Sequence, residues 1–467
     1  MKRVLILLFF LLPASLMWWS CGGASSPSTQ VSGLKYRAFV TNNVSAGTAT
    51  AGIYIVDAVN DVHPFLSPIS AGNTPGMMVV TPNRAQTLVF SGDGTQFSDN
   101  VLSIINNATE ANAAQVPLHS LTESIVISPD SSTAYVALPL ATVIGPPQGI
   151  VEAISLSTGT VTGQAGVPAV RYLSIDNSGN RILGFSDNSD SVAVITPSQI
   201  NIGNAVTYIG GFDRPVAAFF SSDDNTAYVV NCGAECGGNT ASVQQFNLTN
   251  NQLGSYVAVC TPGTTQCAGS VALLNGSTMY LAGTPYSGGL PSQACTGQNT
   301  AASTCGLLTI VDLSAMKVIQ PPSCPAGQQC PIIITDGYHN RIALGANGQL
   351  FIGARTCTEI IPPIPPPTGA ETRGCLSIYN TLTTPVGSVP AGGVVIPPEN
   401  GDVTGIQPIA TRSVVYVVQG QGVPTGGTLY IYDATTDALE NNPNDTNNPG
   451  QVGNLVGNFV DVKTVDF

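Results

Sequence analysis

The sequence predicts an all-β protein, and both the composition and the turn chemistry support this class. Charged residues make up only 9% of the 467-residue chain, which holds 50 glycines and 34 prolines. This composition is too apolar for a disordered chain and too rich in turn-forming residues for a helical one. No stretch beyond the N-terminus shows the 3.6-residue periodicity of an amphipathic helix. We therefore expect short strands joined by turns.

One stretch, Glu123–Gly163, shows the unit from which the chain is built. It contains a short apolar strand, Ser124–Ser128, a tight turn led by a proline, and a strand centred on an aromatic residue, Thr133–Leu138. A long loop and a third strand, Ile150–Leu156, follow. The segment Val161–Ala169 supplies a weaker outer strand. The unit therefore predicts a sheet of four strands.

Strands of the same aromatic-centred kind recur along nearly the whole chain. Their aromatic residues are Phe39, Phe90, Tyr135, Phe185, Tyr228, Tyr280, Phe351 and Tyr416. Four strands in a period of about 45–50 residues are typical of a β-propeller, in which each blade buries its faces against its neighbours. The repeat predicts eight blades, with seven as the alternative. The C-terminal segment Phe459–Phe467 is expected to complete the first blade before Lys35–Val40, which closes the ring of a single domain over residues 35–467.

The repeat also resembles the YVTN family of β-propeller repeats. The segments that carry the resemblance are Phe39-Val40-Thr41-Asn42, Ser128-Pro129-Asp130 with Ala134-Tyr135-Val136, Leu308–Asp312 and Leu429–Thr436. The resemblance implies the propeller fold for nearly all of the chain. It further implies a relation to surface-layer and lipoprotein modules and a similarity to lactonase-type propellers.

The N-terminus predicts export. Two basic residues precede an apolar run, Val4–Leu12, that is too short for a stable membrane span, so residues 1–20 are predicted to be a signal peptide. The segment Ser20-Cys21-Gly22-Gly23 resembles a bacterial lipoprotein signal. That resemblance implies that Cys21 is lipidated, that residues 21–34 form a linker, and that the protein is anchored to a bacterial membrane of the cell envelope, in the periplasm or at the cell surface. Ordinary secretion and an uncleaved anchor are the alternatives.

Cysteine usage agrees with export. Ten cysteines follow Cys21, and they fall into close neighbours that predict five disulfides: Cys232 with Cys236, Cys260 with Cys267, Cys295 with Cys305, Cys324 with Cys330, and Cys357 with Cys375. Spacing alone does not fix the connectivity. A zinc site is the rival reading, but only one pair has the short spacing that zinc sites favour.

Charge and histidine content argue against several functional classes. A net charge of −13 disfavours nucleic acid as a partner, because binding to phosphates needs a basic surface. The three histidines, His63, His119 and His339, fall in different repeats, so we expect neither a His-dependent triad nor a multi-histidine metal site. The acidic turn Asp187-Asn188-Ser189-Asp190 resembles a calcium loop but lacks EF-hand spacing. We expect no metal and no cofactor.

The candidate site lies on the face that carries the long loops. In a propeller, the loops between second and third strands share one face with the links between blades, and function concentrates on loops held by a rigid scaffold. The innermost strands begin at this face, beside the central channel. The polar residues at those positions are the predicted ligand-binding residues: Glu123, Arg171, Arg214, His339, Arg341 and Asp402.

Three arginines and a histidine in an arginine-poor chain predict a ring that binds anions, since guanidinium groups suit carboxylate or phosphate. The alternative is that these residues are a solvated rim, or form ion pairs with nearby acids such as Asp213 and Asp336.

We therefore expect an exported, lipid-anchored, monomeric binding module that acts through its disulfide-bonded loop face. The expected partner is an envelope protein, a glycan or an anionic small molecule. The alternative is a lactonase-like hydrolase with its site at the channel mouth, where His339, or an acid such as Glu123 beside an arginine, would serve as general base.

Overall fold

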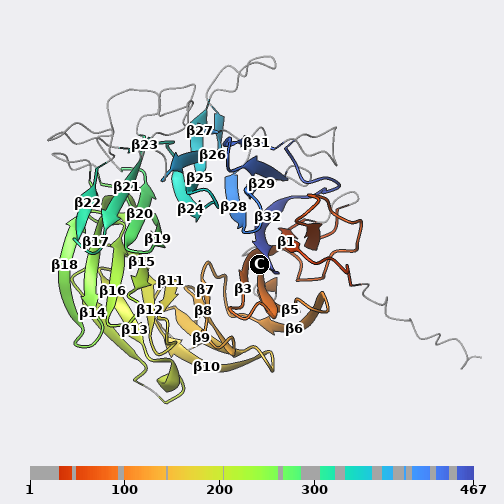
Figure 1. Ribbon diagram of the computed structural model, residues 1–467. Helices are drawn as coiled ribbons and strands as arrows, with labels where there is room; N and C mark the ends of the chain where they lie inside the picture. The colour runs from red at the N-terminus through yellow and green to blue at the C-terminus, as the bar shows by residue number, and fades with distance from the viewer. Residues whose placement is uncertain are drawn as a thin grey trace, which may run out of the picture. The chain divides into compact units, whose positions relative to one another are not determined.

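A computed structural model describes thirteen stretches of the chain (Figure 1). They are residues 31–44, 49–92, 99–143, 146–202, 204–260, 267–285, 305–320, 332–359, 371–381, 394–395, 402–420, 427–440 and 450–466. The predicted signal peptide, Cys21 and most of the predicted linker lie outside them. Within these stretches, no helix is long and apolar enough to cross a membrane.

The described residues from Ser32 onward form eight antiparallel sheets arranged as the blades of a β-propeller. Six sheets have four strands, one has three and one has five. The predicted fold class and the count of eight blades are therefore confirmed. Each predicted aromatic residue lies in the second strand of its blade, where all except Tyr228 are buried.

The strands of the first four blades follow in order from the innermost outward. Blade one holds β32 (Phe459–Thr464), β1 (Arg37–Asn42) and β2 (Gly52–Asp57), and blade two holds β3 (Pro75–Val80), β4 (Gln86–Ser91), β5 (Val101–Asn106) and β6 (Ala111–Pro117). Blade three holds β7 (Ile125–Ile127), β8 (Thr133–Leu138), β9 (Ile150–Ser155) and β10 (Thr160–Gly166), and blade four holds β11 (Val170–Ile175), β12 (Ile182–Ser186), β13 (Ser191–Ile195) and β14 (Val206–Gly210). A short 3-10 helix, η2 (Pro197–Gln199), precedes β14.

Blade five holds β15 (Pro215–Phe220), β16 (Thr226–Asn231), β17 (Ser242–Asn247) and β18 (Gln252–Ala258). Blade six holds β19 (Val271–Asn275), β20 (Thr278–Gly283), β21 (Gly306–Asp312), β22 (Lys317–Ile319) and β23 (Ile332–Ile334). Blade seven holds β24 (Tyr338–Leu344), β25 (Gln349–Glu359), β26 (Glu371–Asn380) and β27 (Val394–Val395), and blade eight holds β28 (Asp402–Ile409), β29 (Val414–Gly420), β30 (Thr428–Asp433) and β31 (Ala438–Leu439). A second 3-10 helix, η3 (Gly233–Cys236), follows β16.

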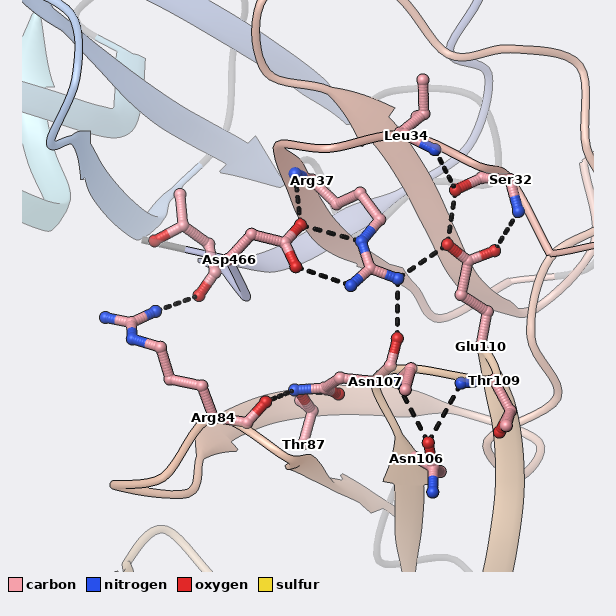
Figure 2. A network of polar contacts seen from close by, with 12 residues as sticks. Ser32, Leu34, Arg37, Arg84, Thr87, Asn106, Asn107, Thr109, Glu110 and Asp466 are labelled. Carbon is pink, nitrogen blue, oxygen red and sulfur yellow. Dashed lines mark hydrogen bonds and ion pairs between the residues drawn. The ribbon is translucent and has the colours of Figure 1, made fainter.

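The ring closes through the C-terminal strand, as predicted. β32 pairs antiparallel with β1 and contacts the inner strands β3 and β28 of the two neighbouring blades. Figure 2 shows Arg37 at this junction, between Asp466 and Glu110. Its Nε and Nη2 donate to the Asp466 carboxylate at 2.8 and 2.6 Å, and its Nη1 donates to Glu110 Oε1 at 2.7 Å. One buried guanidinium thus joins the C-terminal end of the chain to blades one and two.

The hydrophobic core is distributed around the ring in the interfaces between blades. Leu88 and Ile104 of blade two, for example, pack with Val136 and Ile154 of blade three. Clusters of the same kind lie at the other interfaces, including the one that joins blades eight and one. Because every blade is buried on both faces, the blades form a rigid scaffold for the loops.

Two details differ from the sequence prediction. The repeat predicts a loop over Ala354–Gly374, but β25 continues to Glu359 and β26 begins at Glu371, so much of this segment is a hairpin. Thr356 lies at a bulge with a positive φ of 54°, and beyond it the ladder resumes with Cys357 paired to Arg373. The outer strand of blade six is in two pieces, β22 and β23, which both pair with β21.

Candidate functional site

A pocket of about 400 Å³ lies where the innermost strands of several blades begin. Among the described residues, its lining comes from blades three to seven: Glu123, Arg171, Tyr172, Phe185, Ser186, Asp187, Asn188, Arg214, Pro215, Val216, Cys236, Ser270, Tyr338 and Arg355. Most of these residues precede or open the inner strands, and the others lie in or just after the second strands. This places the pocket at the channel mouth on the loop-bearing face.

A β-bulge brings two adjacent residues to this pocket. In β11, Val170 pairs with Ser186 and Tyr172 pairs with Phe185, so Arg171 is an extra residue without a partner across the ladder. Neighbouring residues on a regular strand point to opposite faces of the sheet, whereas a bulge re-aims one of them. Arg171 and Tyr172 both line the pocket for this reason. The inner strands of blades five, seven and eight have similar register shifts near their starts.

Arg171 is held by two carboxylates. Its Nε and Nη2 donate to Asp187 Oδ1 and Oδ2 at 2.6 and 2.7 Å, and its Nη1 donates to Glu123 Oε1 at 2.7 Å. Asp187 raises the pKa of Arg171 most, and Glu123 adds to the effect. Because Glu123 comes from blade three and the other two from blade four, the group bridges adjacent blades and fixes one wall of the pocket.

The other two arginines of the pocket also have acidic partners. Arg214 Nη1 lies 3.4 Å from Asp190 Oδ1, and its Nη2 donates to the carbonyl of Gly237 at 3.3 Å. Arg355 Nε lies 3.2 Å from Asp402 Oδ2. Each guanidinium group of the described lining therefore lies within 3.4 Å of a carboxylate, and Nε of Arg214 is buried without a hydrogen-bond partner.

The structure brings together three of the six predicted ligand-binding residues. Glu123, Arg171 and Arg214 line the pocket, and Asp402 reaches it only through Arg355. Arg341 is not in the lining, because its Nε donates to the carbonyl of Thr404 at 2.7 Å and its Nη1 to a second backbone carbonyl. Among the described residues, the predicted ring of arginines is thus a set of separate ion pairs and carbonyl contacts.

His339 is fully buried rather than exposed to the channel. Its Nδ1 lies 3.4 Å from Thr284 Oγ1, and its backbone carbonyl accepts from Ser270 Oγ at 3.1 Å. Burial lowers the pKa of His339 to about 4. In this arrangement His339 is neutral and has no surface with which to contact a ligand.

Two tyrosines, Tyr172 and Tyr338, also line the pocket. Tyr172 Oη donates to Glu123 Oε2 at 3.3 Å and also interacts with Tyr338. Burial raises the pKa of Tyr172 most, and the neighbouring Tyr338 and Glu123 raise it further. Tyr338 remains 41% exposed. The pocket therefore offers aromatic surface beside its ion pairs.

A buried carboxyl group lies beside the pocket in the loop closed by the Cys232–Cys236 disulfide. Glu235 of η3 reaches towards blade six, where it interacts with the backbone amides of Thr284 and Gly269 and with the side chain of Ser270. Burial raises the pKa of Glu235 to about 7, against the opposing effect of these contacts. Cys236 and Ser270, on either side of this contact, line the pocket.

Three of the five predicted disulfides are present. They are Cys232–Cys236, Cys260–Cys267 and Cys357–Cys375. Cys305 is also disulfide-bonded, but its predicted partner Cys295 lies outside the described residues.

The other two predicted disulfides, Cys295 with Cys305 and Cys324 with Cys330, therefore stay predictions. The bond predicted between Cys324 and Cys330 is not among those that the structure describes, because Cys324 and Cys330 both lie outside the described residues. The rival zinc reading gains no support, since no group of three or more His, Cys, Asp or Glu side chains in the described part of the chain could hold a metal ion.

Comparison with known proteins shows the fold. Neither a protein-family model nor a curated protein sequence matches the chain. Among solved structures, the dihydro-heme d1 dehydrogenase NirN in complex with DHE is similar with a TM-score of 0.57 and 11% identity, over 93% of this chain and 76% of that one. Hydrazine synthase of Kuenenia stuttgartiensis is similar with a TM-score of 0.51 and 12% identity, over 76% of this chain and 95% of that one.

The chain is an eight-bladed β-propeller. At such low identity, the likeness extends to the architecture and not to the site. The resemblance to YVTN repeats stays a prediction.

Several residues of this propeller's pocket are not predicted from sequence. Tyr172, Tyr338 and Arg355 have no motif of their own, and a bulge cannot be located from one sequence. Asp187 and Asp190 do stand out as an acidic turn, but one that resembles a calcium loop. In the structure they are the partners of Arg171 and Arg214. The sequence signal that could have predicted these ion pairs is that Asp187 and Asp190 lie between Arg171 and Arg214, in the repeats of two consecutive blades.

Proposed function

We propose that the protein is an exported, lipid-anchored binding module that holds a small polar ligand in the channel-mouth pocket. The observation that carries this proposal is the convergence of side chains from five consecutive blades on one cavity of about 400 Å³. That volume falls within the range of about 300–1,000 Å³ that is usual for small-molecule sites. Such a cavity is too small for a folded partner, which favours a ligand of one or two rings.

The environment proposed for this module follows from the cysteines and the N-terminus. Disulfides persist in oxidising compartments, and this propeller has three disulfides, each of which closes a loop. The signal-like segment and Cys21 supply the route of export and the anchor in this proposal. An anchored propeller would present its loop face to ligands of the cell envelope.

A tryptophan reporter tests the site. Because both tryptophans, Trp18 and Trp19, precede Cys21, the processed protein is expected to contain none. The substitution Tyr338→Trp places a single fluorophore in the pocket, and Tyr256→Trp, at a side chain that is 65% exposed on β18, serves as the control. Titration with cellobiose, N,N′-diacetylchitobiose, citrate and phosphate should give a saturable change in emission only in the pocket variant. The same response in both variants, or in neither, would contradict the proposal.

One observation favours hydrolysis as a second candidate function. Glu123 lies beside Arg171, with 2.7 Å between Oε1 and Nη1, and it also accepts from Tyr172. It can contact a bound lactone, whereas the buried His339 cannot. A panel of lactones tests this alternative: turnover that is lost in Glu123→Gln would support it, and absence of turnover in the wild-type protein would rule against it.

A further inference from the structure

We propose that the ligand of the channel-mouth pocket is a neutral, polyhydroxylated molecule, namely a short glycan, and not an anion. This inference rests on the proposed ligand-binding function and names the chemical class that the pocket would select. It follows from the charge balance of the pocket, its remaining hydrogen-bonding capacity and its aromatic surface.

Charge compensation disfavours an anion. The three guanidinium groups among the described lining residues contact four carboxylates, those of Glu123, Asp187, Asp190 and Asp402. Two of the four, Glu123 and Asp187, line the pocket themselves. An incoming carboxylate or phosphate would have to displace one of these partners or lie beside it, and like charges in a partly desolvated site repel. The net charge of −13 adds long-range repulsion of anions.

The same ion pairs leave donors and acceptors that suit hydroxyl groups. A guanidinium group carries five N–H donors, and Arg171 uses three of them for its two carboxylates. Each carboxylate oxygen has a second lone pair available. A sugar hydroxyl both donates and accepts, so it can bridge a remaining N–H of Arg171 and an oxygen of Asp187 or Glu123. An ionised carboxylate group in place of such a hydroxyl offers acceptors only, and it would leave the carboxylate oxygens beside it without a donor.

The tyrosines provide apolar surface for a sugar ring. Tyr338 is 41% exposed, and Tyr172 lies beside it in the lining. The face of a tyrosine ring is apolar, whereas its hydroxyl is polar, so it can pack on the C–H face of a pyranose while the hydroxyls are hydrogen-bonded nearby. A pocket of about 400 Å³ accommodates a ligand of this size.

Calorimetric titration of the full chain with matched sugars tests the inference. The probes are cellobiose and cellobiouronic acid, which differ by a carboxylate in place of one hydroxymethyl group. We expect cellobiose to bind about tenfold more tightly, which corresponds to about 1.4 kcal/mol. Its affinity should not change between low and high salt, because a neutral ligand is not screened. Tighter binding of the uronic acid, or no binding of cellobiose, would overturn the inference.

The variant Asp187→Asn separates selectivity from folding. It keeps the shape of the side chain and removes one negative charge beside Arg171. We expect it to bind cellobiouronic acid about tenfold more tightly than the wild-type protein does, since one repulsive charge is lost. A gain of binding cannot come from a misfolded protein, and an unchanged or weaker affinity for the uronic acid would overturn the charge argument.

The two proposals can fail separately. If the uronic acid alone changes the emission of Tyr338→Trp, the pocket binds a ligand and only the glycan inference is overturned. If cellobiose binds in the calorimeter but leaves that emission unchanged, the sugar binds elsewhere, and the proposed site is overturned as well.

Discussion

Arg171 holds Asp187 through two parallel hydrogen bonds of 2.6 and 2.7 Å, and both residues line the pocket at the channel mouth. The planar guanidinium group fixes the orientation of this carboxylate, which an ammonium group cannot do. The third contact, to Glu123, extends this order to the next blade. The relative placement of the Asp187 and Glu123 carboxylates in the pocket therefore depends on one side chain.

The variant Arg171→Lys should weaken ligand binding about tenfold while it changes stability little. Lysine keeps the charge but loses the two-pronged contact, and ion pairs this exposed contribute only about 0–1 kcal/mol to folding. Calorimetry with cellobiose and urea denaturation measure the two effects. The matched control is Arg181→Lys in the same blade, whose side chain donates to the backbone carbonyl of Asp224 and does not line the pocket. Equal affinities in both variants would contradict the role of Arg171.

Loss of Arg37 should open the ring closure. The substitution Arg37→Ala removes the cationic partner of Asp466 and of the buried Glu110, and breaking a buried pair costs about 3 kcal/mol or more. We expect a lower urea midpoint and faster proteolysis of the C-terminal strand. If the midpoint matches that of the wild-type protein, the closure depends on strand pairing alone.

Two buried groups should give opposite pH dependences of stability. The pKa of Glu235 is raised from 4.5 to about 7, so its protonated form is favoured on folding and its contribution declines as pH rises from 4.5 to 7. The pKa of His339 is lowered from 6.5 to about 4, so its contribution increases as pH rises from 4 to 6.5. In the wild-type protein these two slopes partly cancel.

The variant Glu235→Gln should reveal the slope that His339 contributes. Its free energy of unfolding should rise with pH between about 4 and 6.5, more steeply than that of the wild-type protein. Urea denaturation at a series of pH values measures this. Parallel curves for the two proteins would show that Glu235 does not titrate in this range.

Removal of the Cys232–Cys236 disulfide should affect binding more than folding. The loop that it closes is short, so the chain-entropy estimate of its contribution to stability is only about 2 kcal/mol. The same loop places Cys236 in the pocket lining and Glu235 beside it. We expect the double substitution of both cysteines by serine to abolish most cellobiose binding, with a small decrease in urea midpoint. Normal affinity would show that the loop is not needed.

Substitution of Cys21 by serine should release the protein from membranes, because a serine cannot take the lipid. Fractionation of cells that express the wild-type and Cys21→Ser chains measures this. An unchanged membrane fraction for the variant would contradict the lipid anchor.

The repeat could be predicted because turns and strands depend on residues that are close together in the sequence. Tight turns and aromatic second strands recur often enough to fix eight blades, and the single spare strand at the C-terminus fixes the closure of β1 by β32. The site could be predicted only in part, since position along an inner strand placed Glu123, Arg171 and Arg214 at the channel mouth. The sequence position does not predict that Arg171 is a bulge residue, that Asp187 and Asp190 pair with the arginines, or that His339 is buried. These three features depend on the register of the strands and on the packing between blades.

The central claim is that a ligand binds among the ion pairs and tyrosines of the channel mouth. A crystal structure of the protein soaked with saturating cellobiose tests it most directly. We expect density for the sugar in the pocket, within hydrogen-bonding distance of Arg171 and Asp187 and against the ring of Tyr338. An empty pocket, with or without density for the sugar elsewhere on the propeller, would contradict the claim.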